Sequence, residues 1–264
     1  MKLIKLNPKT PGTRHTIKIT KNVLLKRNFL FKNLIQYKHK FMGRSSINGR
    51  ITSDHKGAGC KKKFRNIDFK NEKKLGIILA ISYDPSRTSF ISLCFDLEKR
   101  KFFTIQAPFL SFTGFIYYCN NEINEIKSGF RTKIKSIASG SLINNIGLTA
   151  NSTAKYARAA GTYCQLIQKT QITSKIRLPS GKFKEISNDS YATLGLNSNT
   201  QQNLVYIGKA GTNRLKGIKP SVRGIAMNPV DHPHGGNANS GFVYKTPWGK
   251  IAKGVKTRKK KKNE

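Results

Sequence analysis

Short runs of apolar residues, separated by turn-forming residues, dominate the middle of the chain. Leu75 to Tyr83 is an almost continuous apolar run, and two further runs follow at 90–95 and 101–107. Polar clusters at 84–87 and 98–100 separate these runs and favour turns. Short strands joined by turns at this spacing predict an antiparallel barrel or sandwich. A five-stranded OB-type barrel fits residues 44–118.

The same pattern continues over residues 119–203. Strands are predicted at 143–149, 162–169, 172–178, 182–186 and 190–196. The clearest hairpin turn is Leu178-Pro179-Ser180-Gly181-Lys182, because Gly181 can adopt a positive φ. A second barrel, of SH3-like size, fits this segment.

The two ends of the chain lack a sustained hydrophobic period. Residues 1–43 contain no acidic residue and include a turn at 10–15 followed by an extended run, Thr16 to Thr20. Scattered aromatic residues favour a basic extension that orders on a partner over a disordered tail; these are Phe29, Phe31, Tyr37 and Phe41. Residues 204–264 form a second basic extension, in which Asp231 and Glu264 are the only acids.

Charge indicates the kind of partner. The chain has 264 residues, with 50 Lys and Arg against 12 Asp and Glu, a formal charge of +38. This imbalance favours a polyanion, and nucleic acid leads because each neutralised phosphate releases counterions. An anionic membrane surface is the weaker candidate, since no stretch approaches the ~20 apolar residues of a spanning helix. We expect no membrane partner and no small-molecule substrate.

Two segments combine small residues with positive charge. Residues 54–65 join a Gly-rich turn to a lysine cluster, and they lack the Gly-Lys-Ser/Thr ending of a Walker-type loop. We interpret them as a phosphate-contacting segment, with a solvated charge run as the alternative. Residues 154–161 (Ala-Lys-Tyr-Ala-Arg-Ala-Ala-Gly) form either a helical turn or a loop that approaches RNA closely.

The cysteines and the amino-acid composition indicate the cellular compartment in which the protein works. The four cysteines, Cys60, Cys94, Cys119 and Cys164, include no Cys-x-x-Cys pair, which favours a reducing compartment and argues against a zinc ribbon. The N-terminus lacks the features of a secretory signal or a transit peptide. Lys, Asn, Ile and Phe are abundant, and their codons are rich in A and T. This bias suggests an A/T-rich genome, and an organellar genome would explain it.

Residues 223–236 (Arg-Gly-Ile-Ala-Met-Asn-Pro-Val-Asp-His-Pro-His-Gly-Gly) form the most distinctive stretch. Proline disfavours helical geometry in the residue before it, so Asn228 and His232 should not be helical. We expect an extended, stiff loop that holds polar side chains outward. A His-dependent enzyme is one interpretation of His232 and His234, but no clustered ligands or Gly-x-Ser-x-Gly elbow accompany them. We expect no catalytic residue and no metal site.

Residues 227–236 match the signature of the universal large-subunit ribosomal protein two family, which the chain resembles over most of its length. Further matching segments lie at 11–15, 48–52, 67–70, 83–87, 157–162, 178–181 and 246–249. The chain departs from the family's usual pattern at Asp54, at 151–154 and at 237–238. This drift, with the composition, favours a mitochondrial, organelle-encoded form; the alternatives are a plastid or the bacterial cytoplasm.

The resemblance implies an OB-type barrel followed by an SH3-like barrel, with long basic extensions in large-subunit rRNA. It implies a structural role near the peptidyl-transferase centre, in assembly, subunit joining and translation. Implied partners are large-subunit rRNA, neighbouring ribosomal proteins and, through inter-subunit bridging, the small subunit. No cofactor is expected beyond structural Mg²⁺ bound through rRNA. A generic OB module for single-stranded nucleic acid is the alternative, but it leaves the two motif-bearing extensions unexplained.

The residues expected to contact rRNA supply charge for phosphates, polar groups for hydrogen bonds, or rings for stacking on bases. They are Arg14, His15, Arg44, Arg50, His55, Lys61, Lys62, Lys63, Arg65, Arg87, Lys155, Tyr156, Arg158, Lys209, Arg214, Lys216, Arg223, Asn228, Asp231, His232, His234, Trp248 and Lys250.

Overall fold

The computed structural model describes residues 3–20, 24, 32–37, 42–69, 74–120, 127–150, 152–236 and 243–254. The chain divides into two compact units. Unit 1 comprises residues 1–40 and 60–212, and unit 2 comprises residues 41–59 and 213–264. The sheets lie in unit 1.

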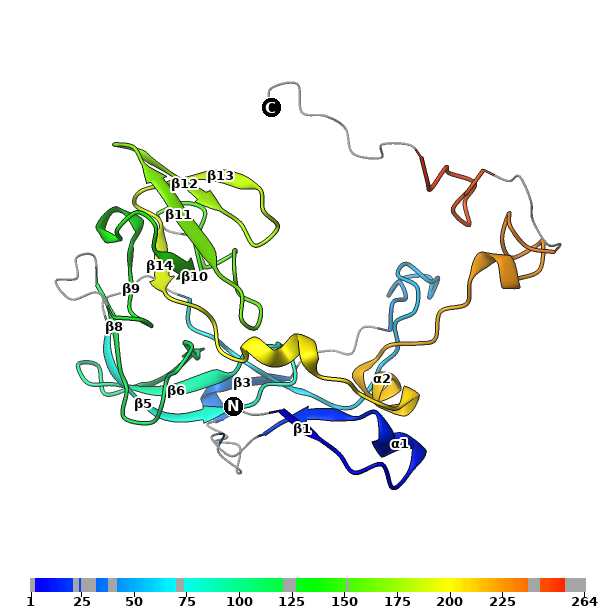
Figure 1. The fold of residues 1–264 in the computed structure, drawn as a ribbon, viewed down its shortest axis with the longest axis horizontal. Coiled ribbons are helices and arrows are strands. Elements are labelled where there is room, and N and C mark those ends of the chain that lie inside the picture. Colours follow the sequence, from blue (N-terminus) through cyan, green and yellow to red (C-terminus); the bar gives the residue numbers. More distant parts are fainter. Residues whose placement is uncertain are drawn as a thin grey trace. The chain divides into compact units, whose positions relative to one another are not determined.

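A ten-stranded sheet forms the frame of unit 1, in the order β13-β12-β11-β10-β14-β9-β8-β5-β6-β7 (Figure 1). Its strands are β5 (Lys74–Ser82), β6 (Ile91–Asp96), β7 (Phe102–Gln106), β8 (Ile116–Cys119), β9 (Arg131–Lys133), β10 (Leu142–Asn144), β11 (Cys164–Lys169), β12 (Thr173–Arg177), β13 (Phe183–Ser187) and β14 (Tyr191–Leu194). Neighbours are antiparallel except β8 and β9, which touch at the single parallel pair Cys119–Arg131. The sheet therefore consists of two groups of strands joined at a narrow seam.

Strands β5 to β8 enclose the first core. Its buried residues include Ile78, Cys94, Phe103 and Tyr117. The predicted runs at 75–83, 90–95 and 101–107 are confirmed as strands, with their ends shifted by about one residue. The register of β5 shifts between Ile78 and Ala80, and a bulge of this kind leaves an intervening residue unpaired.

Strands β9 to β14 enclose a second, separate core, which includes Ile143, Leu166, Ile176 and Ile186. The strands predicted in 162–196 are confirmed. The strand predicted at 143–149 is wrong in its length, because β10 ends at Asn144. The next residue, Asn145, has a φ of 51°, which breaks the extended backbone.

Residues 154–161 form a loop rather than a helical turn. Tyr156 bridges Ile146, and Ala157 follows it with a φ of 50°. The mainly β chain, with two successive strand groups and two cores, is consistent with an OB-type barrel followed by an SH3-like barrel.

The described part of residues 1–43 is ordered within the protein. Strand β1 (Leu3–Lys5) pairs with β2 (Ile17–Ile19), with α1 (Pro11–Arg14) between them, and β3 (Ile35–Tyr37) pairs with β4 (Lys63–Arg65). Ile17 also bridges Tyr206, and Leu24 lies in the first core. Strand pairing supplies backbone hydrogen bonds to these residues, and the ordering of the extension on a partner stays a prediction. Phe29, Phe31 and Phe41 lie outside the described residues.

The helices within the described ranges are short. They are α1, α2 (Ala210–Lys216) and the 3₁₀ turns η1 (Lys32–Leu34), η2 (Ile134–Ser136), η3 (Thr200–Leu204) and η4 (Gly224–Ala226). Within the described residues, no helix has the length and apolar character to cross a bilayer.

Unit 2 joins two segments that are far apart in sequence. Gly57 donates its backbone N–H to Gly217 (2.8 Å), and Lys219 donates to the carbonyl of His55 (2.8 Å). Gly59 has a φ of 63°, and a Cβ there would lie 2.7 Å from the carbonyl oxygen of Leu215. In the described part of this unit, no apolar side chain is fully buried. Backbone hydrogen bonds and close glycine contacts therefore help to join its two segments.

Candidate nucleic-acid interface

The loop 223–236 folds back on itself through two consecutive turns. Asp231 N–H donates to the carbonyl of Asn228 (3.0 Å), and Gly235 N–H donates to that of His232 (2.8 Å). Proline occupies the second position of each turn, where its fixed φ is favourable. Gly236 N–H closes the loop on Met227 (3.1 Å). Asn228 and His232 are non-helical as predicted, but the expected extended loop is wrong, since the prolines initiate turns.

Glycines make this folding sterically feasible. A Cβ on Gly235 would lie 2.1 Å from the carbonyl oxygen of Asn228, and Gly236 has a φ of 98°. At the start of the loop, a Cβ on Gly224 would lie 2.6 Å from the His232 ring. Side chains at these positions would push the loop open.

His232 is the buried side chain of this loop, with 9% of its surface exposed. Its Nδ1 accepts a hydrogen bond from the backbone N–H of His234 (3.0 Å). His234 in turn accepts the backbone N–H of Lys245 at Nε2 (2.8 Å). A ring nitrogen that accepts a hydrogen bond carries no proton, so each neutral ring has its proton on the other nitrogen. His232 thus keeps Nε2–H as its remaining donor.

Aromatic packing extends this arrangement. The rings of His232 and His234 lie 4.7 Å apart, and Tyr244 packs edge-on against His234 at 5.8 Å. The ammonium of Lys253 lies 4.7 Å from the Tyr244 ring centre. Tyr244 and Gly224 were not among the predicted contact residues. Tyr244 follows the family motif and only the fold brings it to His234.

Trp248 occupies the tip of a tight hairpin in the same unit. Lys245 bridges Ile251, and Gly249 N–H donates to the carbonyl of Thr246 (2.9 Å). The Trp248 side chain is 75% exposed. A large, solvent-exposed aromatic ring on a hairpin is suited to stacking on a base.

The exposed His55 side chain also contacts the segment that leads into the loop 223–236. Its Nδ1 lies 3.0 Å from the carbonyl oxygen of Pro220, and its Nε2 lies 3.3 Å from Oγ of Ser221. Since a carbonyl only accepts, Nδ1 carries the proton in this contact. Both ring nitrogens are therefore engaged by the segment that leads into the motif loop.

Most predicted contact residues are exposed. These are Arg14, His15, Arg44, Arg50, His55, Lys61, Lys62, Lys63, Lys155, Arg158, Lys209, Arg214, Lys216, Arg223, Asn228, Asp231, Trp248 and Lys250. Within unit 2, Arg44 and Arg50 share one turn, since Arg44 donates to Gly49 and Ser45 N–H donates to Arg50. Tyr156 is half-buried, with the Lys184 ammonium 5.7 Å from its ring. The departures at Asn151, Asn237 and Ala238 lie outside the described residues.

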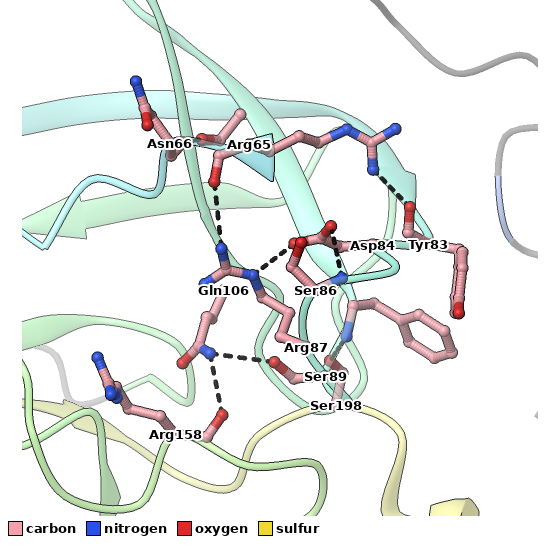
Figure 2. A network of polar contacts seen from close by, with 12 residues as sticks. Arg65, Asn66, Tyr83, Asp84, Ser86, Arg87, Ser89, Gln106, Arg158 and Ser198 are labelled. Carbon is pink, nitrogen blue, oxygen red and sulfur yellow. Dashed lines mark hydrogen bonds and ion pairs between the residues drawn. The ribbon is translucent and has the colours of Figure 1, made fainter. Parts of the chain in front are cut away.

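Arg65 and Arg87, both predicted to contact rRNA, also make contacts within the first strand group (Figure 2). Arg65 is 6% exposed, and its guanidinium donates to the carbonyl of Tyr83. Arg87 pairs with the buried carboxylate of Asp84 and donates to the carbonyl of Arg65 (3.1 Å). Their guanidinium groups make hydrogen bonds and an ion pair within the first strand group, and their contact with rRNA stays a prediction.

The same network joins the two groups of strands (Figure 2). Gln106 donates to Oγ of Ser89 (3.1 Å) and to the carbonyl of Arg158 (2.9 Å), and Phe90 N–H donates to Oγ of Ser198 (3.1 Å). The Arg158 guanidinium lies 5.7 Å from the Phe69 ring centre. Arg158 is therefore held in place while remaining exposed.

The described residues contain no group of three His, Cys, Asp or Glu side chains that could hold a metal ion. One nitrogen of His232 and one of His234 are occupied by backbone N–H groups. The arrangement instead presents exposed cations and rings on a loop of fixed shape.

Comparison with known proteins agrees with this geometry. The ribosomal protein L2 RNA-binding N-terminal domain matches residues 31–117, and the ribosomal protein L2 C-terminal domain matches residues 127–260. "Large ribosomal subunit protein uL2" of Alcanivorax borkumensis is 38% identical over 99% of this chain and 96% of its own length. The proteins of that name from Wigglesworthia glossinidia brevipalpis (39% identical; 100% and 96% covered) and Chlamydia felis (38%; 98% and 95%) are similarly related. The chain belongs to the ribosomal protein L2 family, whose members are structural proteins of the large ribosomal subunit.

Proposed function

We propose that the chain binds large-subunit rRNA near the peptidyl-transferase centre and supports assembly of that region, subunit joining and translation. The observation that carries this proposal is the loop 223–236, folded around His232, with Arg223, Asn228 and Asp231 exposed on it. Phosphates would be neutralised by the exposed cations, and the Nε2–H of His232 would donate to an RNA oxygen. Neighbouring ribosomal proteins are further partners, and contact with the small subunit would arise through an inter-subunit bridge.

Salt dependence tests the electrostatic part of the proposal. The affinity of the purified chain for large-subunit rRNA should fall steeply between about 50 and 200 mM salt, since each phosphate contact releases counterions. Substituting one exposed lysine should reduce the slope of log affinity against log salt concentration by about the value of one phosphate contact. Deleting residues 204–264 should remove much of that slope. An affinity that stays nearly constant over this range would contradict the proposal.

Co-sedimentation tests the structural role. The chain should remain with the large subunit after a high-salt wash, because an integral component is held by many contacts at once. Its release with loosely bound factors would point instead to a generic single-stranded RNA-binding protein.

The host ribosome is a separate question. The A/T-codon bias in composition and the departures at Asp54, 151–154 and 237–238 support a mitochondrial ribosome. The alternatives are a plastid ribosome and a bacterial one, and the bacterial relatives are compatible with the latter. Isolating ribosomes from each compartment and identifying the chain by mass spectrometry would decide between them.

A further inference from the structure

A hollow on the second strand group carries polar side chains that the fold does not use. It has a volume of about 350 Å³ and lies between residues 161–163 and residues 177–179, with Gln165 and Gly181 also lining it. Its size falls within the range of small-ligand sites. No acidic residue lines it.

Strand geometry places two of these side chains together. Gln165 on β11 and Arg177 on β12 are directly paired residues. Their neighbours Cys164, Leu166 and Ile176 are buried in the second core. Because side chains alternate between the two faces of a strand, Gln165 and Arg177 share the face away from that core. Tyr163 precedes β11 and is 44% exposed.

The walls of the hollow are fixed by internal hydrogen bonds. On one side, Gly161 N–H donates to the carbonyl of Ser198 (3.0 Å), and Gly161 has a φ of 64°. On the other, Leu178 N–H donates to Lys182 (2.8 Å) and Gly181 N–H donates to Leu178 (2.9 Å). The hollow therefore exists in the protein alone, and a ligand need not organise it.

Three polar side chains around the hollow are not used in hydrogen bonds or ion pairs within the described part of the protein. Tyr163, Gln165 and Arg177 form no side-chain hydrogen bond or ion pair with a described residue. Arg65, Arg87 and Gln106 in the same unit behave differently, since each is held by the network of Figure 2. Polar groups that converge without partners are available to a ligand.

The chemistry of the three groups matches one nucleotide. A phenol ring stacks on a base, a guanidinium pairs with a phosphate, and a carboxamide offers both a donor and an acceptor to a base edge. We propose that this hollow binds one unpaired nucleotide of large-subunit rRNA, with its base on Tyr163, its phosphate at Arg177 and its base edge at Gln165. This inference rests on the proposed rRNA binding and deepens it by naming a nucleotide site.

A proline-rich peptide is the competing ligand, because Tyr163 and Pro179 also suit an apolar segment. The formal charge of +38 and the absence of acidic lining residues favour a nucleotide, whose phosphate Arg177 would neutralise. The peptide is therefore an outcome to be tested.

The test uses the full chain and large-subunit rRNA. Tyr163→Leu should weaken binding by about 5- to 150-fold, the usual range for losing one stacked base. Tyr163→Phe should bind like the unchanged chain, because it keeps the ring. Arg177→Gln should reduce the salt slope by about one single-strand phosphate, ~0.7. Phe112→Leu is the matched control, since Phe112 is an exposed ring before β8 that does not line the hollow.

Ultraviolet crosslinking gives the direct readout. In the rRNA complex, the peptide containing Tyr163 should carry one nucleotide, and Tyr163→Leu should remove that adduct. Equal binding by the unchanged chain and Tyr163→Leu, or a crosslink from Tyr163 to a protein in intact subunits, would overturn the nucleotide site and leave the proposed function standing. If the unchanged chain fails to bind rRNA with a steep salt slope, both proposals fall. Thermal melting of each variant shows that loss of binding does not reflect unfolding.

Discussion

The imidazole of His232 lies so close to Gly224 that a Cβ on that glycine would come within 2.6 to 2.7 Å of three of its ring atoms. Gly224 opens the 3₁₀ turn η4, and His232 begins the second proline turn of the loop. The two ends of the motif are thus in direct contact, and the missing side chain of one provides the space for the other.

Gly224→Ala should therefore open the loop 223–236. The added methyl group forces the His232 ring to move, and overpacking of this kind costs about 1–3 kcal/mol. Hydrogen exchange of the His234 amide should accelerate, because that N–H bonds to Nδ1 of His232, and rRNA affinity should fall about tenfold or more. Gly211→Ala is the matched control, since a Cβ there meets nothing within 4 Å. Equal exchange rates in the two variants would contradict the packing argument.

His232 can be probed with two amides that each imitate one ring nitrogen. Asn places its amide oxygen near the position of Nδ1 and can still accept a hydrogen bond from the backbone N–H of His234. The longer Gln side chain places its amide near the position of Nε2 instead. If the internal hydrogen bond sets the loop, His232→Asn should assemble into large subunits better than His232→Gln. Incorporation into particles, measured by quantitative mass spectrometry, gives the comparison.

The outcome for His232→Gln also bears on catalysis. We expect impaired assembly or subunit joining. Particles that assemble and join normally but lose only the chemical step of peptide-bond formation would instead support a catalytic role for His232.

The Arg87–Asp84 pair should matter for stability. Asp84 is fully buried and the Arg87 side chain is 18% exposed, so Arg87→Ala leaves a buried carboxylate without its cation. Breaking a buried pair from one side costs about 3–5 kcal/mol. Lys133→Ala removes the exposed pair with Asp189 and should cost about 1 kcal/mol or less. Urea unfolding of both variants is the measurement, and similar losses would show that the network in Figure 2 is not a stabilising element.

Much of the fold could be predicted from the sequence, because strand-forming residues and turn residues alternate clearly in residues 74–196. The internal hydrogen bond of Arg65 could not be predicted, since its partner is the carbonyl of Tyr83, which follows β5 and is 18 residues away in sequence. The shape of the motif loop was also missed. Each X-Pro step indicates a locally extended backbone. Whether two such steps give an extended segment or a closed loop depends on the close approach of Gly235 to Asn228.

Burial separates the four cysteines. Cys60 is exposed, whereas Cys94, Cys119 and Cys164 are buried. At pH 8 a thiol reagent should modify Cys60 quickly and the other three only after unfolding, because thiolates are the reactive form. Rapid labelling in a Cys60→Ser variant would contradict this expectation.

The same burial predicts a loss of stability in alkali. Burial raises the pKa of the Cys164 thiol from its ordinary value of 9.0 to about 11, and it also raises the pKa values of Cys94 and Cys119. A raised pKa means that the folded state holds the proton more tightly, so this contribution is complete below about pH 9 and is lost as pH rises toward 11. Cys164→Ala should show a shallower decline in unfolding free energy over this range than the unchanged chain.

Unit 2 has a consequence for the order of events during synthesis. Its segment 41–59 pairs with residues 217–219, but the whole of 60–212 is translated between them. The strands of unit 1 are complete by Leu194, so they can form while residues 41–59 still await their partner. We therefore expect the nascent chain to carry an incomplete basic unit until residues 213–264, its last fifth, emerge, so that the unit that encloses His232 is completed last.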